Sequence, residues 1–374
     1  MKFADRLDTL QSSAIREMFD KGRQNPNVVD LSIGQADYDM PAPIKDEARR
    51  VLDSVCGRYS PTEGRPDLVA RAHRYLVETV GLPESEEVMI TGGTTGAIML
   101  SMLAFAGPGD EVLLPDPYFV LYPNIARVAG AKPTYYSLFP DFRLRAEAVE
   151  AAITDRTRLV VVNNPSNPTG AVFERDELAA VAEVCAARDI PIMSDEVYDH
   201  FSYDRPHTSI KAFPNVTSVL VAGPSKSHAM AGWRLGWAAA PSVVIDKMRT
   251  LQQFTYTCPP TFAQRAAMAL FDTSPQPTVD RFRGKRELVV RRLREAGYSL
   301  VAPQGAFYVF PRIPWGTDVE FCNAAAEAGL LIVPGRAFSS SKEHFRISYS
   351  ASEERLGRGL DILARLAKAR PSGS

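Results

Sequence analysis

The chain of 374 residues is 45% hydrophobic and 23% charged, which is ordinary for a globular protein with one large domain and one smaller one. Its 43 basic and 44 acidic residues nearly balance, so the basic surface of a nucleic-acid-binding protein is not expected. No stretch approaches the roughly 18 uninterrupted apolar residues of a membrane span, which argues against a membrane-embedded protein.

The cysteines and the N-terminal residues bear on metal binding and location. Four cysteines, at 56, 185, 258 and 322, form no CxxC pair and only five histidines accompany them, so we expect no metal site. Such scattered cysteines are typical of a reducing compartment. The first residues are partly acidic and lack the apolar core of a secretory signal peptide. We therefore expect a cytoplasmic protein.

Strands and helices are predicted to alternate through the first two thirds of the chain. A helix is expected at about 8–22, and further helices at 97–106 and 176–189. The continuous apolar run TRLVVVNN is typical of a strand buried on both faces. This alternation predicts an α/β protein with a mostly parallel sheet. The predicted strands are 86–91, 110–115, 157–164, 190–195 and 216–223.

The pattern changes after about residue 270. A long charged helix is predicted over 277–298, closed by Gly297, and it is followed by short apolar segments mixed with two helices. These features predict a second, α+β domain. The expected division is 1–40 as a segment joining the small domain, 41–275 as the large domain and 276–374 as the small domain. The short segments are 299–303, 305–313, 329–335 and 344–351, and the two helices are 319–329 and 351–369.

Polar residues follow the predicted strands of the large domain. Ligands of open α/β sheets bind outside the carboxyl ends of the strands, so these side chains are expected to face one crevice. The polar residues at those ends are Gly93, Thr94, Thr95, Asn163, Asn164, Asn167, Asp195, Ser225 and Lys226.

The segment TGGTTG, residues 91–96, lies between a predicted strand and a predicted helix. Backbone N–H groups at a helix N-terminus, together with threonine hydroxyls, favour an anion such as phosphate. A tight strand-to-helix turn without a ligand is the alternative. The segment is neither a P-loop, since the Gly-Lys-Ser/Thr ending is absent, nor a GxGxxG fingerprint.

Asp195, Lys226 and Arg234 each have an ordinary explanation, as a helix cap, a solvated loop lysine and a surface ion pair. Together with a phosphate site they match what pyridoxal 5′-phosphate requires: an acid that keeps the ring nitrogen protonated and a lysine that forms an imine. Arg234 can bind the phosphate and, as a nearby cation, lower the pKa of Lys226.

Nine segments, in order along nearly the whole chain, resemble the class I/II aminotransferases, the fold-type-I pyridoxal-phosphate enzymes that include aspartate aminotransferases. The resemblance implies a seven-stranded, mostly parallel sheet in the large domain and a homodimer. It also implies ping-pong transfer of an amino acid's α-amino group to a 2-oxo acid, 2-oxoglutarate being expected, through a Lys226 imine. Elimination, cyclisation or oxidative deamination on the same fold is the alternative, and a non-catalytic ligand sensor is the more distant one. The segments are LSIGQADYDMP, RYSPTEGRPDL, TGGTTGAIML, PDPYFVLYP, NNPSNPTG, SDEVYDHF, SKSHAMAGWRLGW, GAFYVFP and FRISYS.

The resemblance implies a role for each matching residue around the cofactor. Lys226 would form the imine and carry the proton, and Asp195 would pair with the ring nitrogen. Tyr198 and Asn167 would hydrogen-bond the phenolic oxygen, while Phe119 would stack on the ring. The residues expected at the phosphate are Gly93, Thr94, Thr95, Ser225, Arg234 and Tyr59, the last reaching the site of the neighbouring subunit.

Arg346 is expected to bind the substrate carboxylate as a bidentate fork, with the backbone of Gly34 closing over the same group and Asn167 beside it. Gly223 stands where many relatives have serine, which removes one hydroxyl from the phosphate site.

Two further departures concern the substrate side chain. Gln253 and Phe254 stand where one dicarboxylate-specific subgroup has an arginine, which puts aspartate specificity in doubt. Arg336 stands where many relatives have serine, and we expect a solvated loop arginine rather than a contact with an acidic substrate. Aromatic candidates that favour an apolar or aromatic substrate side chain are Phe19, Tyr38, Phe119, Tyr256 and Phe307.

Overall fold

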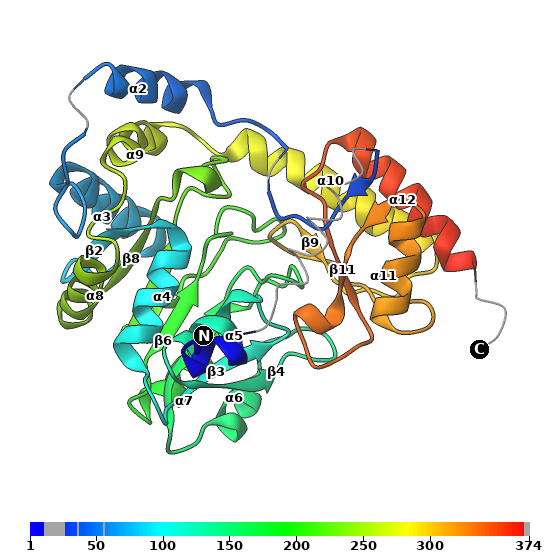
Figure 1. Ribbon diagram of the computed structural model, residues 1–374, viewed down its shortest axis with the longest axis horizontal. Helices are drawn as coiled ribbons and strands as arrows, with labels where there is room; N and C mark the ends of the chain where they lie inside the picture. The colour runs from blue at the N-terminus through cyan, green and yellow to red at the C-terminus, as the bar shows by residue number, and fades with distance from the viewer. Residues whose placement is uncertain (11–26, 36, 55–56, 370–374) are drawn as a thin grey trace.

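The computed structural model describes residues 1–10, 27–35, 37–54 and 57–369, and its largest feature is a seven-stranded sheet (Figure 1). Strand β8 runs antiparallel to both of its neighbours, and the other neighbouring pairs are parallel. The predicted α/β class with a mostly parallel sheet is therefore confirmed. In spatial order the strands are β2 (Glu86–Thr91), β8 (Gly236–Pro241), β7 (Ser218–Ala222), β6 (Ile192–Asp195), β5 (Thr157–Asn163), β3 (Glu111–Asp116) and β4 (Lys132–Ser137).

Helices cover both faces of this sheet, as the burial of β7 illustrates. Val219 and Val221 pack in one apolar cluster with α4 (Gly93–Phe105), α5 (Leu121–Val128) and α8 (Ser242–Thr255). Leu220, between them, points to the other face and packs with α3 (Pro66–Val80). Because successive side chains of a strand alternate, a strand covered on both faces must be apolar throughout. The other helices of this region are α2 (Ala42–Leu52), α6 (Ala146–Ala152), α7 (Arg175–Ala186) and α9 (Thr261–Ala266).

A second region, on the right in Figure 1, contains the C-terminal segments. Strand β12 (Phe345–Ser348) lies between β11 (Val333–Pro334) and β9 (Tyr308–Val309) in an antiparallel sheet. Strand β1 (Val29–Asp30) pairs with β10 (Leu330–Leu331), so the N-terminal segment lies beside the C-terminal one. The domain boundaries remain a prediction. The helices here are α10 (Gln276–Glu295), α11 (Asp318–Glu327) and α12 (Glu353–Lys368).

Some predicted elements differ from the structure. Of the short apolar segments, 299–303 forms no strand, and the amides of Gln304 and Gly305, which follow it, both donate to the carbonyl of Gly170. Of the helix expected at 8–22, residues 11–22 lie outside the described residues, and Asp5–Thr9 forms the short 3₁₀ helix η1. The other 3₁₀ helices are η2 (Ile210–Ala212), η3 (Ala231–Trp233), η4 (Ala267–Asp272) and η5 (Gly335–Ala337).

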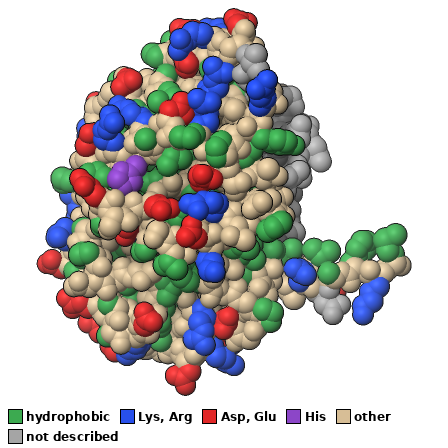
Figure 2. Space-filling model, turned by 90° about the vertical axis from the view of Figure 1, so that its left-hand side faces the viewer, with side chains coloured by type: hydrophobic (Ala, Val, Ile, Leu, Met, Phe, Trp, Pro, Cys, Tyr) green, Lys and Arg blue, Asp and Glu red, His purple; other side chains and the backbone are tan. Residues whose placement is uncertain are grey.

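The distribution of charge on the surface and the apolarity of the helices both agree with the balanced composition. Figure 2 shows Lys and Arg side chains interspersed with Asp and Glu over one face of the molecule, rather than gathered into a patch of one sign. In the part of the chain that the structure describes, no helix is long and apolar enough to cross a bilayer.

Candidate active site

A cavity of about 210 Å³ lies at the carboxyl ends of the parallel strands. Asn163 and Asp195 are the last residues of β5 and β6 and are directly paired across the sheet, while Lys226 follows the end of β7. Parallel strands bring their carboxyl ends to one edge, which is why residues far apart in sequence meet here. Of the residues assigned a role at the cofactor or at the substrate carboxylate, all line the cavity except Gly93 and Tyr59. Asn164, also expected at the crevice, does not line it, and its side chain bonds to the backbone of Thr208 and Phe173 instead. The assigned residues that line it are Gly34, Thr94, Thr95, Phe119, Asn167, Asp195, Tyr198, Ser225, Lys226, Arg234 and Arg346.

Asp195 is buried and held by two donors. The hydroxyl of Tyr122 donates to its Oδ2 at 2.7 Å, and the amide of Val197 donates to its Oδ1 at 3.3 Å. Burial raises the pKa of Asp195 to about 6, although the bond from Tyr122 lowers it. A buried carboxylate of this kind is stabilised by a cation, so the protonated nitrogen of a ring ligand fits the position.

Tyr122 is a site residue that the sequence analysis missed. It lies one helical turn beyond Phe119, in α5, and the two rings meet edge to face with centroids 5.5 Å apart. The signal was present in PDPYFVLYP, where two aromatic residues stand three positions apart at the start of a helix.

Lys226 reaches across the cavity from the loop after β7. Its Nζ donates to the carbonyl of Gly34 at 2.8 Å and lies 5.8 Å from the ring centroid of Tyr198. The hydroxyl of Tyr38 donates to the backbone carbonyl of Lys226 at 2.8 Å and so fixes the loop. Within the described ranges Lys226 forms no ion pair with a carboxylate. A lysine without a counter-ion in a cavity is suited to bond an aldehyde.

The N-terminus of α4 forms a concave, positively polarised surface. Gly93 has φ +76°, and a Cβ added there would lie 2.6 Å from Nη2 of Arg234, so only glycine lets the guanidinium approach. Arg234 also donates to the carbonyl of Gly92 at 3.3 Å. No side chain caps this helix, and the hydroxyls of Thr94 and Thr95 lie at the same end. Helix amides, hydroxyls and a permanent cation together fit a phosphate group.

Gly223 has a steric explanation. A Cβ added to it would lie 2.8 Å from the Cα of Gly236, the first residue of β8. The close approach of these two strand ends therefore leaves no room for the serine found in many relatives. Ser225 is buried and lines the cavity, which leaves it as the hydroxyl on this loop.

Arg346 is a buried guanidinium whose hydrogen bonds go to neutral acceptors. Its Nη1 donates to Oδ1 of Asn167 at 3.1 Å and its Nη2 donates to the carbonyl of Ser32. Its Nε has no partner among the described residues, and burial lowers the pKa of Arg346. The rings of Tyr308 and Phe338 lie over it, each with the centroid 4.6 Å from Cζ. Because a buried charge is costly without an opposite charge, the site fits a carboxylate ligand.

Tyr308 also escaped the sequence analysis, although GAFYVFP was singled out as a segment. Its hydroxyl and that of Tyr198 are 2.8 Å apart. The pKa of Tyr198 is raised far above its usual value by burial, so the side chain stays a neutral hydrogen-bond donor.

Several predicted residues lie away from the cavity. Tyr59 is 86% exposed and does not line it, and Phe254 is 81% exposed on α8. Tyr256 supports the turn before α4 instead, because its hydroxyl accepts from the amide of Gly92 at 3.1 Å. Phe307 is buried in the apolar core. Phe19 lies outside the described residues.

Arg336 is exposed, as expected, but it also forms an ion pair that the sequence did not predict. Its side chain is 43% exposed, its Nη2 donates to Oδ1 of Asp318 at 2.6 Å, and its backbone amide donates to Oδ2 at 2.8 Å. Asp318 is fully buried at the start of α11, so Arg336 serves as its counter-ion. No sequence signal links two residues 18 positions apart in this way.

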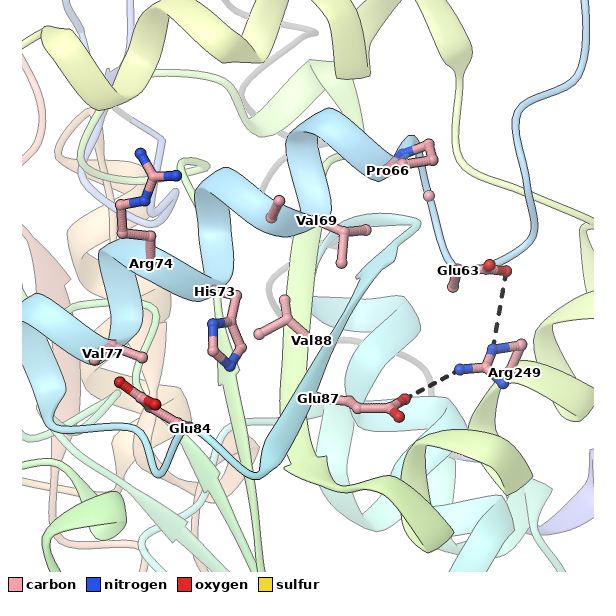
Figure 3. Close-up of a pocket in the computed structure, with 12 residues that line it drawn as sticks. Glu63, Pro66, Val69, His73, Arg74, Val77, Glu84, Glu87, Val88 and Arg249 are labelled. Carbon is pink, nitrogen blue, oxygen red and sulfur yellow. Dashed lines mark hydrogen bonds and ion pairs between the residues drawn. The ribbon is translucent and has the colours of Figure 1, made fainter.

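A larger cavity, of about 690 Å³, lies between α3, β2 and α8 (Figure 3). None of the predicted site residues lines it. Arg249 is neutralised there by Glu87, at 3.1 Å, and by Glu63, at 3.8 Å. His73 bonds to the carbonyl of Glu86 at 3.1 Å. The smaller cavity, which gathers a lysine, an acid and two arginines, is therefore the candidate active site.

Comparison with known proteins identifies the family to which this chain belongs. The family described as aminotransferase class I and II matches residues 26–363. The aspartate aminotransferase of Pyrococcus abyssi is 37% identical over 98% of this chain and 99% of its own length. Aromatic-amino-acid aminotransferase 2 of Thermococcus litoralis is 36% identical over the same shares. A solved aspartate aminotransferase from Thermus thermophilus, with maleate, superposes with a TM-score of 0.93 at 32% identity, covering 98% of this chain and 100% of that one.

Proposed function

The chain belongs to the class I and II aminotransferases, and we propose that it moves the α-amino group of an amino acid to 2-oxoglutarate in two half-reactions that share one site. It is an aminotransferase that uses pyridoxal 5′-phosphate, and its substrates are amino acids and 2-oxo acids. One observation carries the proposal: Lys226, Asp195 and Arg346 line a single cavity.

The chemistry of the cavity supports a defined position for each end of the cofactor. When bound, pyridoxal 5′-phosphate supplies an electron sink for the charge left at Cα after its proton departs. Thr94, Ser225 and Arg234 would hold the phosphate against the N-terminus of α4. Asp195 would keep the ring nitrogen protonated, with Tyr122 preserving its negative charge through the 2.7 Å bond.

Lys226 is the residue we assign to proton transfer. Its amine, when free, is a base that can accept the proton from Cα and later return it as an acid. The bond from Nζ to the carbonyl of Gly34 supports this role, because Arg346 donates to the carbonyl of Ser32 in the same segment. Arg346 would bind the substrate carboxylate and so orient the Cα–H bond toward Lys226.

We assign an apolar or aromatic amino acid as the donor. Within the described ranges, the cations that line the cavity are Lys226, Arg234 and Arg346, and each already has a role toward the cofactor or the α-carboxylate. No further cation of this set remains for a side-chain carboxylate, whereas Phe119 and Tyr308 offer apolar surface. Of the relatives named above, two are described as aspartate enzymes and one as an aromatic-amino-acid enzyme.

A homodimer in the cytoplasm completes the proposal. Tyr59 is 86% exposed on its own subunit, which agrees with a side chain that extends into a neighbour's site. Sedimentation of the purified protein tests the dimer. Mixing a Tyr59→Ala subunit with a Lys226→Ala subunit tests the sharing. If Tyr59 serves the opposite subunit, the mixed dimer has one intact site and one site with both lesions, so activity should return, whereas each site carries one lesion if Tyr59 serves its own subunit.

A visible spectrum of the purified protein, recorded with a panel of amino acids, tests the proposed function. An amino acid that removes the band of the cofactor bound at Lys226 is a donor, and aromatic donors should act at the lowest concentrations. Assay of 2-oxo acid, ammonia and hydrogen peroxide distinguishes transamination from elimination and oxidative deamination. A protein that shows no band with added cofactor would contradict the proposal.

A further inference from the structure

Tyr308 lies between the residues assigned to the cofactor and those assigned to the substrate carboxylate. It is in β9, it is 2% exposed, and it lines the cavity. Its hydroxyl contacts Tyr198, which follows β6 of the large sheet, at 2.8 Å. Its ring covers Arg346, which is in β12 of the small sheet. One side chain therefore touches a residue assigned to the cofactor and a residue assigned to the substrate.

The direction of the hydroxyl contact follows from the role of Tyr198. A phenol has one proton to donate and lone pairs that accept. If Tyr198 donates its proton to the phenolic oxygen of the cofactor, it can only accept from Tyr308. Hydrogen bonds in such a chain strengthen one another, so the bond from Tyr308 makes Tyr198 the stronger donor.

The same side chain sets the distance to the segment of Gly34. A Cβ added to Gly34 would lie 1.8 Å from the Tyr308 hydroxyl oxygen, so Gly34 rests directly on this group. The carbonyl of Gly34 in turn accepts from Lys226 Nζ at 2.8 Å. The position of Tyr308 thus bears on Lys226 as well, through one intervening residue.

We propose that Tyr308 is a positioning residue that acts on both halves of the site: its hydroxyl strengthens Tyr198 as a donor to the cofactor, and its ring holds Arg346 in place for the substrate carboxylate. This inference rests on the proposed function, since it presumes a cofactor beside Tyr198. The two parts of the side chain are separable, because phenylalanine retains the ring and lacks the hydroxyl.

The hydroxyl is tested by titrating the visible absorbance of the Tyr308→Phe holoenzyme, without substrate, across the neutral and alkaline range. A weaker Tyr198 stabilises the negative phenolic oxygen of the bound cofactor less. The pKa of the chromophore should therefore rise, by about half a pH unit or more. The control is Tyr349→Phe, which also loses a buried hydroxyl, one that donates to Ala306 at 3.1 Å, and neither Tyr349 nor Ala306 lines the cavity.

A double variant decides whether the effect passes through Tyr198. Tyr198→Phe should raise the chromophore pKa, and adding Tyr308→Phe to it should raise it no further, because the chain of bonds is already broken. Equal shifts in Tyr308→Phe and Tyr349→Phe, an unmoved titration, or additive shifts in the double variant would overturn the inference. So would loss of cofactor from Tyr308→Phe. Absence of a band in the wild-type protein would instead overturn the proposed function.

The ring is tested by comparing Tyr308→Leu with Tyr308→Phe on the donor that the amino acid panel identifies. Phenylalanine keeps an aromatic face over Arg346, so its KM should stay within about twofold of the wild type. Leucine removes that face, and a desolvated cation–π contact is strong enough to raise KM about tenfold. Equal KM values for the two variants would remove the ring from the proposal.

Discussion

The two halves of the site are built in different ways. The cofactor half, Thr94, Asp195, Lys226 and Arg234, stands on the loops and strand ends of the seven-stranded sheet. The carboxylate half, Gly34, Tyr308 and Arg346, comes from the N-terminal segment and a sheet of three short strands. The first half depends on backbone topology, because parallel strands end together. The second depends on side-chain packing.

The two halves also treat charge differently. Asp195 and its neighbours form a polar network that includes hydroxyl and amide donors. Arg346 has two aromatic rings packed over its guanidinium and donates to neutral oxygens, and within the described ranges it forms no ion pair. Under the proposed function, the cofactor half would hold a ligand that stays bound, whereas the carboxylate half would keep a charge that each new substrate neutralises. Substitutions in the first should alter cofactor binding or chemistry, and those in the second should alter substrate affinity.

The largest effect is expected for Lys226→Ala. Loss of both the bonding amine and the proton carrier should lower kcat by at least about 10³-fold. The phosphate contacts of Thr94 and Arg234 remain, so cofactor should still bind, which equilibrium dialysis would measure. Wild-type turnover in this variant would contradict the assignment of the cofactor half.

Arg346→Lys comes next and tests the carboxylate half. Lysine cannot form the planar fork that binds a carboxylate at two points, and it leaves the oxygens of Asn167 and Ser32 poorly paired. We expect kcat/KM to fall about 10²-fold or more, mainly through KM, with cofactor affinity unchanged. The matched control is Arg312→Lys, because Arg312 pairs with Glu343 outside the cavity. Equal losses in both variants would argue against a substrate role.

Without the family resemblance, the residues themselves indicated more of the cofactor half than of the carboxylate half. Asp195 and Lys226 could be placed because strand ends are visible as apolar runs followed by polar residues. Arg346 was assigned only through the family resemblance, since nothing in FRISYS indicates that its arginine is buried. Tyr308 and Phe338, which cover it, come from segments far apart in the chain, and their contact depends on tertiary packing.

Residues whose partners lie far away along the chain were also hard to predict. Tyr122 could have been inferred from helical spacing to Phe119, but its partner Asp195 is 73 positions away. Strand β8, GWAAAP, lacks the β-branched residues that mark strands and is held by its pairing with β2 and β7. Local patterns predict elements and their ends, whereas pairings between elements require the fold.

A smaller effect, limited to one pH range, is expected for Tyr122→Phe. The Tyr122 bond lowers the pKa of Asp195, which burial has raised to about 6, so its removal should raise that pKa further toward neutrality. Fewer Asp195 side chains are then ionised near neutral pH, and cofactor affinity should fall about tenfold there and recover as the pH rises. The control is Tyr136→Phe, whose buried hydroxyl donates to Val161 instead. A pH-independent loss would show that the hydroxyl acts by packing.

The Asp195 carboxyl should also make the stability of the cofactor-free protein depend on pH. The folded pKa of Asp195, about 6, lies above the ordinary value of 3.8, so folding favours its protonated form. The stability that this provides is present at low pH and is lost as the pH rises through about 6. Asp195→Asn should remove this dependence, which urea unfolding of the cofactor-free protein at several pH values would measure. A cofactor nitrogen beside Asp195 should remove it as well, so the holoprotein serves as the second control.

The smallest effect on activity is expected for Arg336→Ala, although the side chain is an arginine in the same region as Arg346. Its charge is already neutralised by Asp318, and it does not line the cavity. We therefore expect kcat/KM to stay within about twofold. Stability should fall by about 1–2 kcal/mol, because the buried Asp318 keeps only its bonds from the backbone amides of Val319 and residue 336. Thermal unfolding and steady-state kinetics measure the two expectations separately. A loss of activity without a loss of stability would mean that Arg336 contacts substrate, and the carboxylate half would then extend to η5.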